Sequence, residues 1–396
     1  MASMVMEKNK RSINLKVALT EANKSVSSNE NFICSPLGIH ILLSILANGS
    51  TGETRNQIYK YLGSKTLKEI NQTASEIMEV VSPKIDASPA GPKVSFVNGS
   101  WVNQQNTSLR PAFQKLLQTT YKADAKAVDF KKKEEVCKEI NSWVSEATRG
   151  VITEILSPEV LEQDTILVLG NALFFKAAWK TRFTRRDNKL FRLITGEHVR
   201  APFMSTSFRG YYEYEFQGGC FDDFNFVRFP YKTGQDTTRQ FAMYIFLPNS
   251  NDGLLGLLLR FSKDSGFLDK HIELSDVVLY DLWIPKFKFS YTFSVKDTLM
   301  QLGLDRMFLN VGELNKIVKP PLSEQLYVSK ILQRSFVEVN EEGTLAASVM
   351  LSQIGGGPPP PNQFSFVADD PFLFTIREET SQVTLFVGTV LNPLLE

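Results

Sequence analysis

Residues 341–348 read Glu341-Glu342-Gly343-Thr344-Leu345-Ala346-Ala347-Ser348. Two carboxylates solvate the start of this stretch, and the glycine after them gives the backbone a free pivot. The side chains that follow are small or compatible with a β-strand. The combination suits a segment that is exposed in one state of the protein and becomes a buried strand in another.

The composition is that of a large chain with balanced charge. Of its 396 residues 43% are hydrophobic, so a sizeable core can form. Its 44 basic and 43 acidic residues leave a net charge of +1, which argues against nucleic acid or an anionic membrane as a partner. No apolar run approaches the ~18 residues of a membrane span. We expect a monomer with neither kind of partner.

Cysteine use and the N-terminus both bear on location. Cys34, Cys137 and Cys220 are far apart and odd in number, and they show neither a disulfide framework nor a metal-ligand spacing. Reduced thiols favour a reducing compartment. The start of the chain, MASMVMEKNKRS, lacks the apolar region of a secretory signal. We expect a cytoplasmic or nucleo-cytoplasmic protein without metal or cofactor, and extracellular release without a signal stays open.

Asn-x-Ser/Thr sequons occur several times, and without a secretory signal we expect them to be unused. Two of them precede glycine and are interpreted as structural turns. The sequons lie at Asn23, Asn48, Asn71, Asn98 and Asn106, and the two before glycine are Asn48 and Asn98.

Helical patterns dominate the first half of the chain. Ser35 and Pro36 form a helix start, with serine as the N-cap and proline at the first helical position, and the apolar run to Ala47 predicts a buried helix. Further helices are predicted over 51–62, 66–81 and 134–148, and from Ser294 as an N-cap. The apolar stripe of the helix at 134–148 comprises Val136, Ile140, Trp143, Val144 and Ala147, with Gly150 as the stop.

Strand patterns dominate the second half. Residues 165–175 and 241–247 are nearly continuous apolar runs, typical of strands covered on both faces. Residues 283–289 alternate as a half-buried strand, and 371–377 and 382–390 form a pair around a turn. No repeat or linker divides the chain. We predict one α+β domain with large, mainly antiparallel sheets.

Several short motifs along the chain follow one another in the order typical of a single family. They are Asn31 to Leu37, Asn171 to Trp179, Ile284 to Phe287, Glu341 to Ser348, Phe366 to Phe374, Phe386 to Gly388, and Asn392-Pro393. Together they resemble the serpins, and the plant serpins in particular. The resemblance spans almost the whole chain. It implies a single serpin domain over residues 1–396, with about eight or nine helices and an exposed reactive-centre loop at about 341–365.

The resemblance also implies roles for three groups of residues. The hinge of the loop comprises Glu341, Glu342, Gly343, Thr344, Ala346, Ala347 and Ser348. Counting from the hinge glutamates places the nominal reactive bond at Gly357–Pro358. The region that controls opening of a sheet for the loop comprises Ser35, Asn171, Trp179 and Gln333. None of these residues is expected to be catalytic.

Some residues near these groups depart from the family pattern. Gly38 stands in place of a serine, Gln333 in place of a histidine, and Asp370 in place of the histidine of an Asp-His-Pro motif. Leu345 stands where plant members usually carry glutamate. Because an amide both donates and accepts hydrogen bonds, Gln333 can still join a polar network. The departures bear on the efficiency of inhibition and leave the fold untouched.

The motifs of common enzyme classes are missing from the sequence. It contains no Gly-x-Ser-x-Gly elbow and no phosphate-binding glycine loop. Its three histidines, His40, His198 and His271, share no motif. Without an activated nucleophile or a metal cluster, hydrolysis has no candidate residues, so we predict that the protein is not an enzyme.

The loop sequence predicts what the protein does. After a cut near Gly357, the proline-free segment 344–357 could join a sheet with a full ladder of hydrogen bonds. We predict an inhibitor of serine endopeptidases that acts by suicide cleavage and loop insertion, with papain-like cysteine proteases open as further targets. No Lys or Arg lies between Gly343 and Ile376, so the target is not expected to be trypsin-like. The alternative is a non-inhibitory serpin whose loop and Pro-rich tract, residues 355–361, bind a partner such as a polyproline-reading protein.

Overall fold

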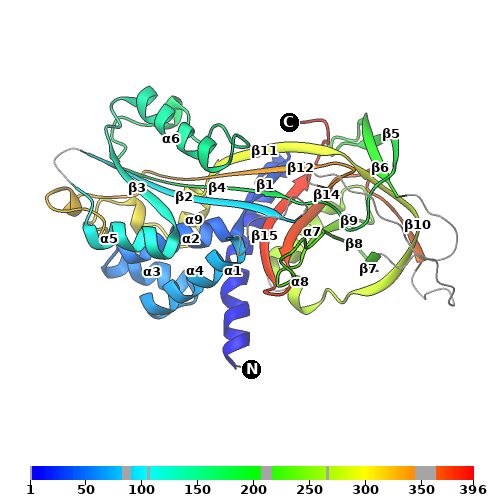
Figure 1. The fold of residues 1–396 in the computed structure, drawn as a ribbon, viewed down its shortest axis with the longest axis horizontal. Coiled ribbons are helices and arrows are strands. Elements are labelled where there is room, and N and C mark those ends of the chain that lie inside the picture. Colours follow the sequence, from blue (N-terminus) through cyan, green and yellow to red (C-terminus); the bar gives the residue numbers. More distant parts are fainter. Residues whose placement is uncertain (1, 83–90, 105–107, 207–215, 265–266, 344–362) are drawn as a thin grey trace.

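Two β-sheets with helices on both sides form an elongated molecule (Figure 1). The computed structural model describes residues 2–82, 91–104, 108–206, 216–264, 267–343 and 363–396. Within these residues the chain forms nine α-helices and fifteen strands. Helices and strands share one fold, which confirms the predicted α+β class. The ten-stranded sheet is mainly antiparallel, as predicted. The five-stranded sheet has two antiparallel and two parallel pairings, so the prediction of mainly antiparallel strands holds for the larger sheet only.

The five-stranded sheet has the strand order β11–β12–β4–β2–β3. Its central strand β4 is buried at every residue except the last, Lys176, because a hydrophobic core and helices cover each of its two faces. This burial confirms the strand predicted over 165–175. The strands are β2 (Lys93–Asn103), β3 (Ala123–Val128), β4 (Leu167–Lys176), β11 (Phe287–Ser294) and β12 (Lys330–Val339).

The pairing of β4 with β12 is one of two parallel pairings in this sheet, the other being that of β2 with β3. β4 and β12 run parallel, whereas each is antiparallel to its neighbour on the other side. Their register runs from Val168–Lys330 to Phe174–Phe336. β12 continues beyond Phe336 to Val339, still paired with β11. The junction between β4 and β12 is therefore closed along most of its length and ends just before residues 340–343.

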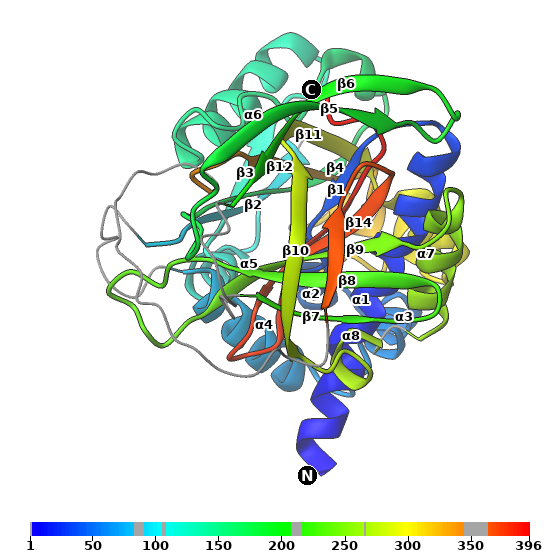
Figure 2. The ribbon, with the colours of Figure 1, turned by 90° about the vertical axis from the view of Figure 1, so that its right-hand side faces the viewer.

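The second sheet has ten strands and lies toward the end of the molecule away from α3 and α5 (Figures 1 and 2). Its order is β1–β15–β14–β9–β8–β7–β10–β6–β5, and β13 pairs with β10 outside this path. The predicted strands over 241–247, 371–377 and 382–390 are confirmed here as β9, β14 and β15. The strands are β1 (Phe32–Cys34), β5 (Arg185–Arg192), β6 (His198–Ser205), β7 (Phe216–Cys220), β8 (Phe224–Pro230), β9 (Phe241–Pro248), β10 (Ser275–Pro285), β13 (Gln363–Val367), β14 (Phe372–Glu378) and β15 (Val383–Val390).

The single strand predicted over 283–289 is wrong. Pro285 ends β10, where it is paired with Phe203 of the ten-stranded sheet, and Phe287 begins β11 opposite Val339 of the five-stranded sheet. Between them Lys286 donates its backbone N–H to Pro202 at 2.8 Å. The chain thus passes from one sheet to the other at a proline, which has no N–H for the ladder. Burial alternates only after the junction, over residues 286–289, whereas Trp283, Ile284 and Pro285 are all buried.

Helix α2 (Pro36–Gly49) contacts β4 of one sheet and β15 of the other. All of its residues except Asn48 are buried, as its apolar sequence predicted, and the Ser35 hydroxyl accepts a hydrogen bond from the Gly38 amide at 3.3 Å. Asn48 lies inside this helix and Asn98 inside β2, so the interpretation of both as turns is wrong. Glycine follows Asn98 because the ring of Trp101 covers that position, where a Cβ would lie 2.2 Å from the ring.

Helix α6 (Lys133–Ala147) lies across the five-stranded sheet on the face opposite α2 (Figure 1). Of its predicted stripe, Val136, Ile140 and Val144 are buried and Trp143 is half-buried, but Ala147 is exposed. The other helices are α1 (Ala2–Ser27), α3 (Gly52–Leu62), α4 (Leu67–Val81), α5 (Pro111–Leu116), α7 (Gly253–Lys263), α8 (Phe267–Lys270) and α9 (Lys296–Gln301), with a π turn (Leu117–Tyr121) and 3₁₀ turns (Pro158–Val160, Arg306–Phe308 and Leu322–Glu324). Ser294 ends β11 and lies one residue before the α9 cap position, Val295.

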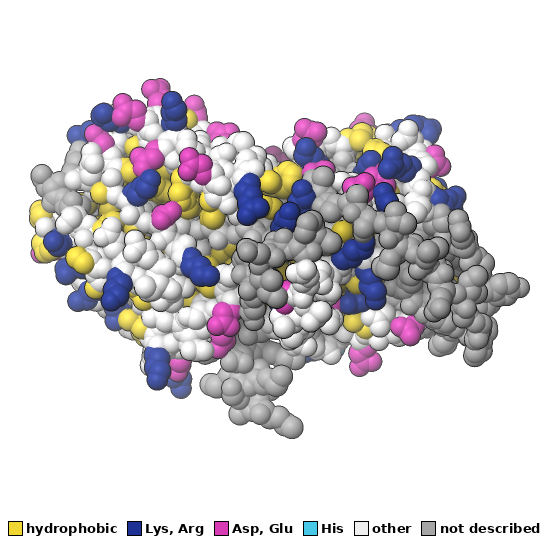
Figure 3. All heavy atoms as spheres, in the orientation of Figure 1, with side chains coloured by type: hydrophobic (Ala, Val, Ile, Leu, Met, Phe, Trp, Pro, Cys, Tyr) yellow, Lys and Arg dark blue, Asp and Glu magenta, His cyan; other side chains and the backbone are white. Residues whose placement is uncertain are grey.

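In the described part of the chain, the helices and one face of the surface bear on the expectations about membranes and charge. No helix in that part is long and apolar enough to cross a membrane. On the face drawn in Figure 3, basic and acidic side chains are interspersed. This distribution agrees with the balanced composition.

Candidate functional site

The candidate site lies where β12 ends beside the chain that follows β4. Of the predicted hinge, Glu341, Glu342 and Gly343 are described. The hinge residues Thr344, Ala346, Ala347 and Ser348 and the nominal reactive bond Gly357–Pro358 lie outside the described residues. The predicted loop range of about 341–365 extends into β13, which begins at Gln363.

The chain reverses direction at residues 340–343. The Asn340 and Gly343 backbones exchange hydrogen bonds of 3.1 and 3.2 Å across a tight turn. Gly343 also forms an antiparallel bridge with Ala178, just beyond the end of β4. Gly343 therefore bridges Asn340 on one side and Ala178 on the other, antiparallel to both.

Gly343 has two reasons to be glycine. Its φ is +122°, in the range that L side chains rarely adopt. A Cβ there would lie 2.3 Å from the Ala177 carbonyl oxygen, 2.6 Å from the Ala178 Cα and 2.7 Å from the Trp179 nitrogen, all backbone atoms. The residue is thus a point of close contact, in addition to the backbone pivot expected from the sequence.

Both hinge carboxylates lie near cations. The sequence predicted that both would be solvated, and this prediction is wrong for Glu341, which is buried. Glu341 is 5% exposed, and its Oε1 pairs with Arg186 Nε at 2.6 Å and Lys286 Nζ at 3.2 Å. Burial opposes its ionisation, but a backbone hydrogen bond and these two cations hold its pKa below the ordinary value. Glu342 is more exposed and lies 3.5 Å from Arg182.

Trp179 follows β4 and forms hydrogen bonds with the turn at residues 340–343. Its indole Nε1 donates to the Asn340 carbonyl at 2.9 Å, and its backbone N–H donates to the Glu342 carbonyl at 3.2 Å. The ring is 3% exposed and stacks on Tyr231 with 4.5 Å between centroids. The tryptophan is therefore a structural contact of the hinge.

The other predicted residues of the sheet-opening region meet in a buried row of amides. Gln333 of β12 is paired directly opposite Asn171 of β4, and its Nε2 donates to Asn171 Oδ1 at 3.2 Å. Gln333 also forms two hydrogen bonds of 2.8 Å with the backbone of Ser35. Its Oε1 accepts from the Ser35 N–H, and its Nε2 donates to the Ser35 carbonyl. Asn171 Nδ2 donates to Asn98 Oδ1 of β2 at 2.8 Å. Sequence reasoning missed Asn98, although an asparagine within an apolar strand was a usable signal.

The sequence of this chain is similar to those of known proteins. The family described as serpin (serine protease inhibitor) matches residues 10–393. The chain belongs to the serpin family. Among its relatives, the plant serpins Serpin-Z2B of Triticum aestivum and Serpin-ZX of Arabidopsis thaliana are each 39% identical. The matches cover 96% of this chain and 93% of the wheat protein, and 93% and 94% for the Arabidopsis protein.

Solved serpin structures share the fold. That of Arabidopsis AtSerpin1, described as the native stressed conformation, has a TM-score of 0.86 and 35% identity, covering 98% of each chain. An insect serpin from Tenebrio molitor has a TM-score of 0.81 and 26% identity, covering 99% of each chain. The predicted resemblance to plant serpins is thus confirmed.

In this serpin the three histidines lie far from one another in the fold. His40 is buried in α2, His198 begins β6, and His271 follows α8 with its Nε2 3.2 Å from Asp264 Oδ2. Asp370, which replaces the family histidine, pairs with Arg192 Nε at 2.6 Å. No group of three His, Cys, Asp or Glu side chains in the described ranges is arranged to hold a metal ion.

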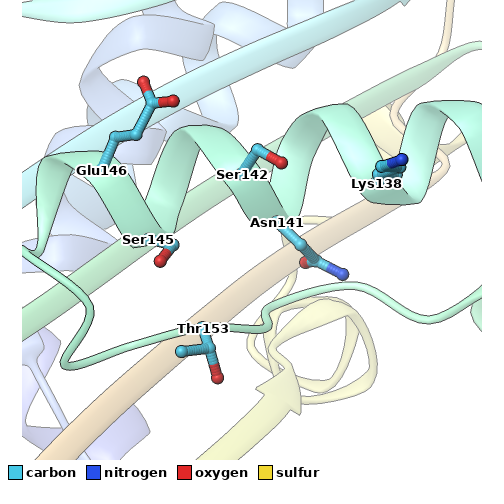
Figure 4. Close-up of a pocket in the computed structure, with 6 residues that line it drawn as sticks. All are labelled: Lys138, Asn141, Ser142, Ser145, Glu146 and Thr153. Atoms are coloured by element: carbon cyan, nitrogen blue, oxygen red, sulfur yellow. The ribbon is translucent and has the colours of Figure 1, made fainter.

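A pocket of about 490 Å³ lies beside α6, lined by side chains of that helix and of the segment after it (Figure 4). Its lining side chains spread along the helix and do not converge on one point. Asn141 is engaged in holding the segment, because its Oδ1 accepts the Ile155 amide at 2.9 Å. The lining comprises Lys138, Asn141, Ser142, Ser145, Glu146 and Thr153.

Proposed function

We propose that this serpin inhibits proteases by suicide cleavage followed by insertion of its loop between β4 and β12. One observation carries the proposal. Gly343 already bridges Asn340 and Ala178, antiparallel to both, in the way that the first residue of an inserted strand would. Because β4 and β12 are parallel, a strand that continued from Gly343 between them would be antiparallel to each.

The loop sequence has the properties that insertion requires. Residues 344–357 contain no proline, so each can donate to a ladder. Each new backbone hydrogen bond would contribute about 0.5–1.5 kcal/mol, and burial of Met350 and Ile354 about 1.5–3 kcal/mol each. Summed over the segment, insertion would release on the order of ten kcal/mol, enough to distort an attached protease.

The residues of the loop restrict the target. The first basic residue after the hinge is Arg377, which lies beyond the loop. Because trypsin-like proteases cut after Lys or Arg, we propose a target that is not trypsin-like. Met350 and Leu351 suit chymotrypsin-like or papain-like enzymes, but a cut there would leave a tether too short for complete insertion and would make the serpin a substrate. Phe364 is less suited, because it lies in β13 and its ring contacts Phe366 with 6.4 Å between centroids.

A panel of serine and cysteine proteases tests the proposal. The serpin is incubated with each enzyme, and the products are separated under denaturing conditions. We expect at least one enzyme to yield an adduct that survives denaturant, and the same enzyme with a blocked active site to yield none. Cleavage of the loop by every enzyme without any adduct would refute the proposal.

The alternative is a non-inhibitory serpin that binds through its loop. The Gly-Pro tract at 355–361 supports this alternative, because flexible glycine followed by stiff polyproline could present a ligand to a polyproline-reading protein. Binding to an immobilised polyproline-reading domain, lost on replacement of Pro358 to Pro361 by alanine, would support it.

We also propose a reducing compartment as the site of action. All three cysteines are free thiols, with Cys34 and Cys137 buried and Cys220 exposed. Fractionation of cells that express the native protein tests the location.

A further inference from the structure

The hydrogen bond between Gln333 and Asn171 crosses the junction that insertion would open. The two residues are directly opposite in the parallel register of β12 and β4, and the bond is 3.2 Å long. Neighbouring strands lie about 4.8 Å apart, so a strand placed between them would separate the two backbones by about 9.6 Å. The side-chain bond cannot span that distance. It has to break before the loop passes this level of the sheet.

Both partners of this bond are anchored on their outer sides. Gln333 is held to the backbone of Ser35 by two bonds of 2.8 Å. Asn171 is held to Asn98 at 2.8 Å and to the Val97 carbonyl at 3.2 Å. The side chains of Gln333, Asn171 and Asn98 are at most 1% exposed. Separation of β4 from β12 therefore leaves buried amide groups that need new partners.

Gly38 supplies the room for this bond. A Cβ at position 38 would lie 2.0 Å from Asn171 Oδ1 and 2.3 Å from Gln333 Nε2, the two atoms that form the bond. Gly38 has no positive φ, so its backbone does not require glycine. Glycine lowers helix propensity, and α2 nevertheless has it in its first turn. The residue is small because the amides of Gln333 and Asn171 occupy the space beside it.

We infer that Gly38 and Gln333 are a matched pair, in which the glycine leaves the space that lets Gln333 position its amide between Ser35 and Asn171, across the junction of β4 and β12. The two departures from the family pattern, glycine for serine and glutamine for histidine, then compensate for each other. A side chain at position 38 would exclude the Gln333 amide. A histidine ring at position 333, which reaches less far than the glutamine amide, would leave space beside Gly38. The consequence for inhibition rests on the proposed function, but the pairing itself does not.

A double-mutant cycle tests the pairing in the uncut protein. The variants are Gly38→Ser, Gln333→His and the two combined, and the measurement is the melting temperature. We expect Gly38→Ser to lower it by about 1–4 °C because of overpacking, and Gln333→His to lower it through lost hydrogen bonds. The double variant should melt above Gly38→Ser. If the two shifts simply add, the pair is not matched.

Two further variants keep the test decisive. Gly256→Ser places the same side chain in α7, where a Cβ meets nothing within 4 Å, so it should change the melting temperature little. Gln333→Asn shortens the amide side chain without overpacking. It weakens the same hydrogen bonds and can be measured if Gly38→Ser does not fold. A Gly256→Ser shift as large as that of Gly38→Ser would overturn the steric argument.

The loop-cleaved protein separates a positioning role from a merely structural one. In the inserted form the bond between Gln333 and Asn171 is already broken, so we expect Gln333→Asn to lower the melting temperature of the uncut form more than that of the cleaved form. The same variant should raise the ratio of adduct to cleaved serpin, because the sheet opens more readily. Equal melting shifts in both forms would refute the positioning role. If cleavage causes no insertion at all, the proposed function fails, but the cycle in the uncut protein still decides the pairing.

Discussion

At the scale of single residues, Gly343 carries both a strained backbone angle and a close contact with three backbone atoms. Gly343→Ala should therefore push the turn at 340–343 away from Ala178. We expect a loss of about 1–3 kcal/mol in the stability of the uncut protein. Gly150→Ala is a matched control, since Gly150 also has a positive φ of +78° but has nothing within 4 Å of its Cβ position. Thermal melts of the two variants should differ; if Gly150→Ala is equally damaging, strain alone accounts for the effect and the contact is unimportant.

Thr344 follows Gly343 and would be the first inward-facing residue of the inserted strand. Thr344→Arg should abolish the protease adduct while leaving cleavage intact, because an unpaired charge would be buried on insertion. Thr344→Ser should behave like the parent protein. The measurement is the yield of denaturant-stable adduct with a protease that forms one. An unchanged yield with Thr344→Arg would refute insertion at this position.

The polarity of single residues was a poor guide to burial at the hinge. Glu341 looks solvated from its neighbours in sequence, yet Arg186 and Lys286, far away in the chain, allow it to be buried. Asn98 was interpreted as part of a turn because glycine follows it, yet it lies in β2, where it accepts a hydrogen bond from Asn171, which is distant in sequence. Local sequence cannot show which distant group will satisfy a polar side chain.

At the scale of elements, patterns internal to one segment predicted most helices and strands. The cap at Ser35, the buried run of β4 and the stripe of α6 are each decided by residues within the element. The junction between β10 and β11 was missed because its position depends on which sheet each half meets. The stripe of α6 was overextended at Ala147, which is exposed although Ser95 of β2 donates to its carbonyl at 2.9 Å, because α6 ends there and the next residue, Thr148, is buried instead.

Helix α3 illustrates a cap that comes from a distant part of the chain. Thr51, at its N-cap position, makes no side-chain cap bond, and Glu313 replaces it by accepting the amides of Glu53 and Thr54 at 3.3 and 2.8 Å. Hydrogen bonds from Arg306, and then from Thr54 and these amides, outweigh the effect of burial and lower the pKa of Glu313 from 4.5 to about 2. A negative charge at a helix N-terminus is stabilising.

This arrangement makes a prediction for acid stability. The folded pKa lies below the unfolded one, so the contribution of Glu313 is present above about pH 4.5 and is lost as the pH falls toward 2. Glu313→Gln should lower stability near neutral pH by about 1–2 kcal/mol after allowance for screening, and the melting temperatures of variant and parent should approach each other below about pH 4.5 and converge near pH 2. Glu273→Gln, at an exposed position, is the control. A difference between parent and Glu313→Gln that stays constant from pH 7 to pH 2 would contradict the assignment.

At the scale of the whole molecule, the closed junction between β4 and β12 is expected to be the less stable of two arrangements. If so, cutting the loop should stabilise the protein, whereas a nick in an ordinary protein only adds freedom to its unfolded state. The cut can be placed at will, because no Lys or Arg lies between Gly343 and Ile376. Gly356→Arg and Leu351→Arg each introduce one trypsin site in this range. The first cut releases nearly the whole segment 344–357, and its new arginine is the last residue of the released strand, where the long side chain can extend to solvent. The second cut releases about half of the segment.

The two cuts should differ in their effect on thermal stability. A release on the order of ten kcal/mol corresponds to a rise of about 10 °C or more in the melting temperature of a chain this long, so the Gly356→Arg protein should gain about that much on cleavage. The Leu351→Arg protein should gain less, because fewer residues can join the sheet. Adding Thr344→Arg to the Gly356→Arg variant should remove most of the gain, since the strand would then have to bury a charge at its first position. Differential scanning calorimetry of cut and uncut samples, with the cut position checked by mass, measures each gain. A melting temperature that stays unchanged after complete cleavage at residue 356 would mean that the junction does not open to the loop, and would favour the non-inhibitory alternative.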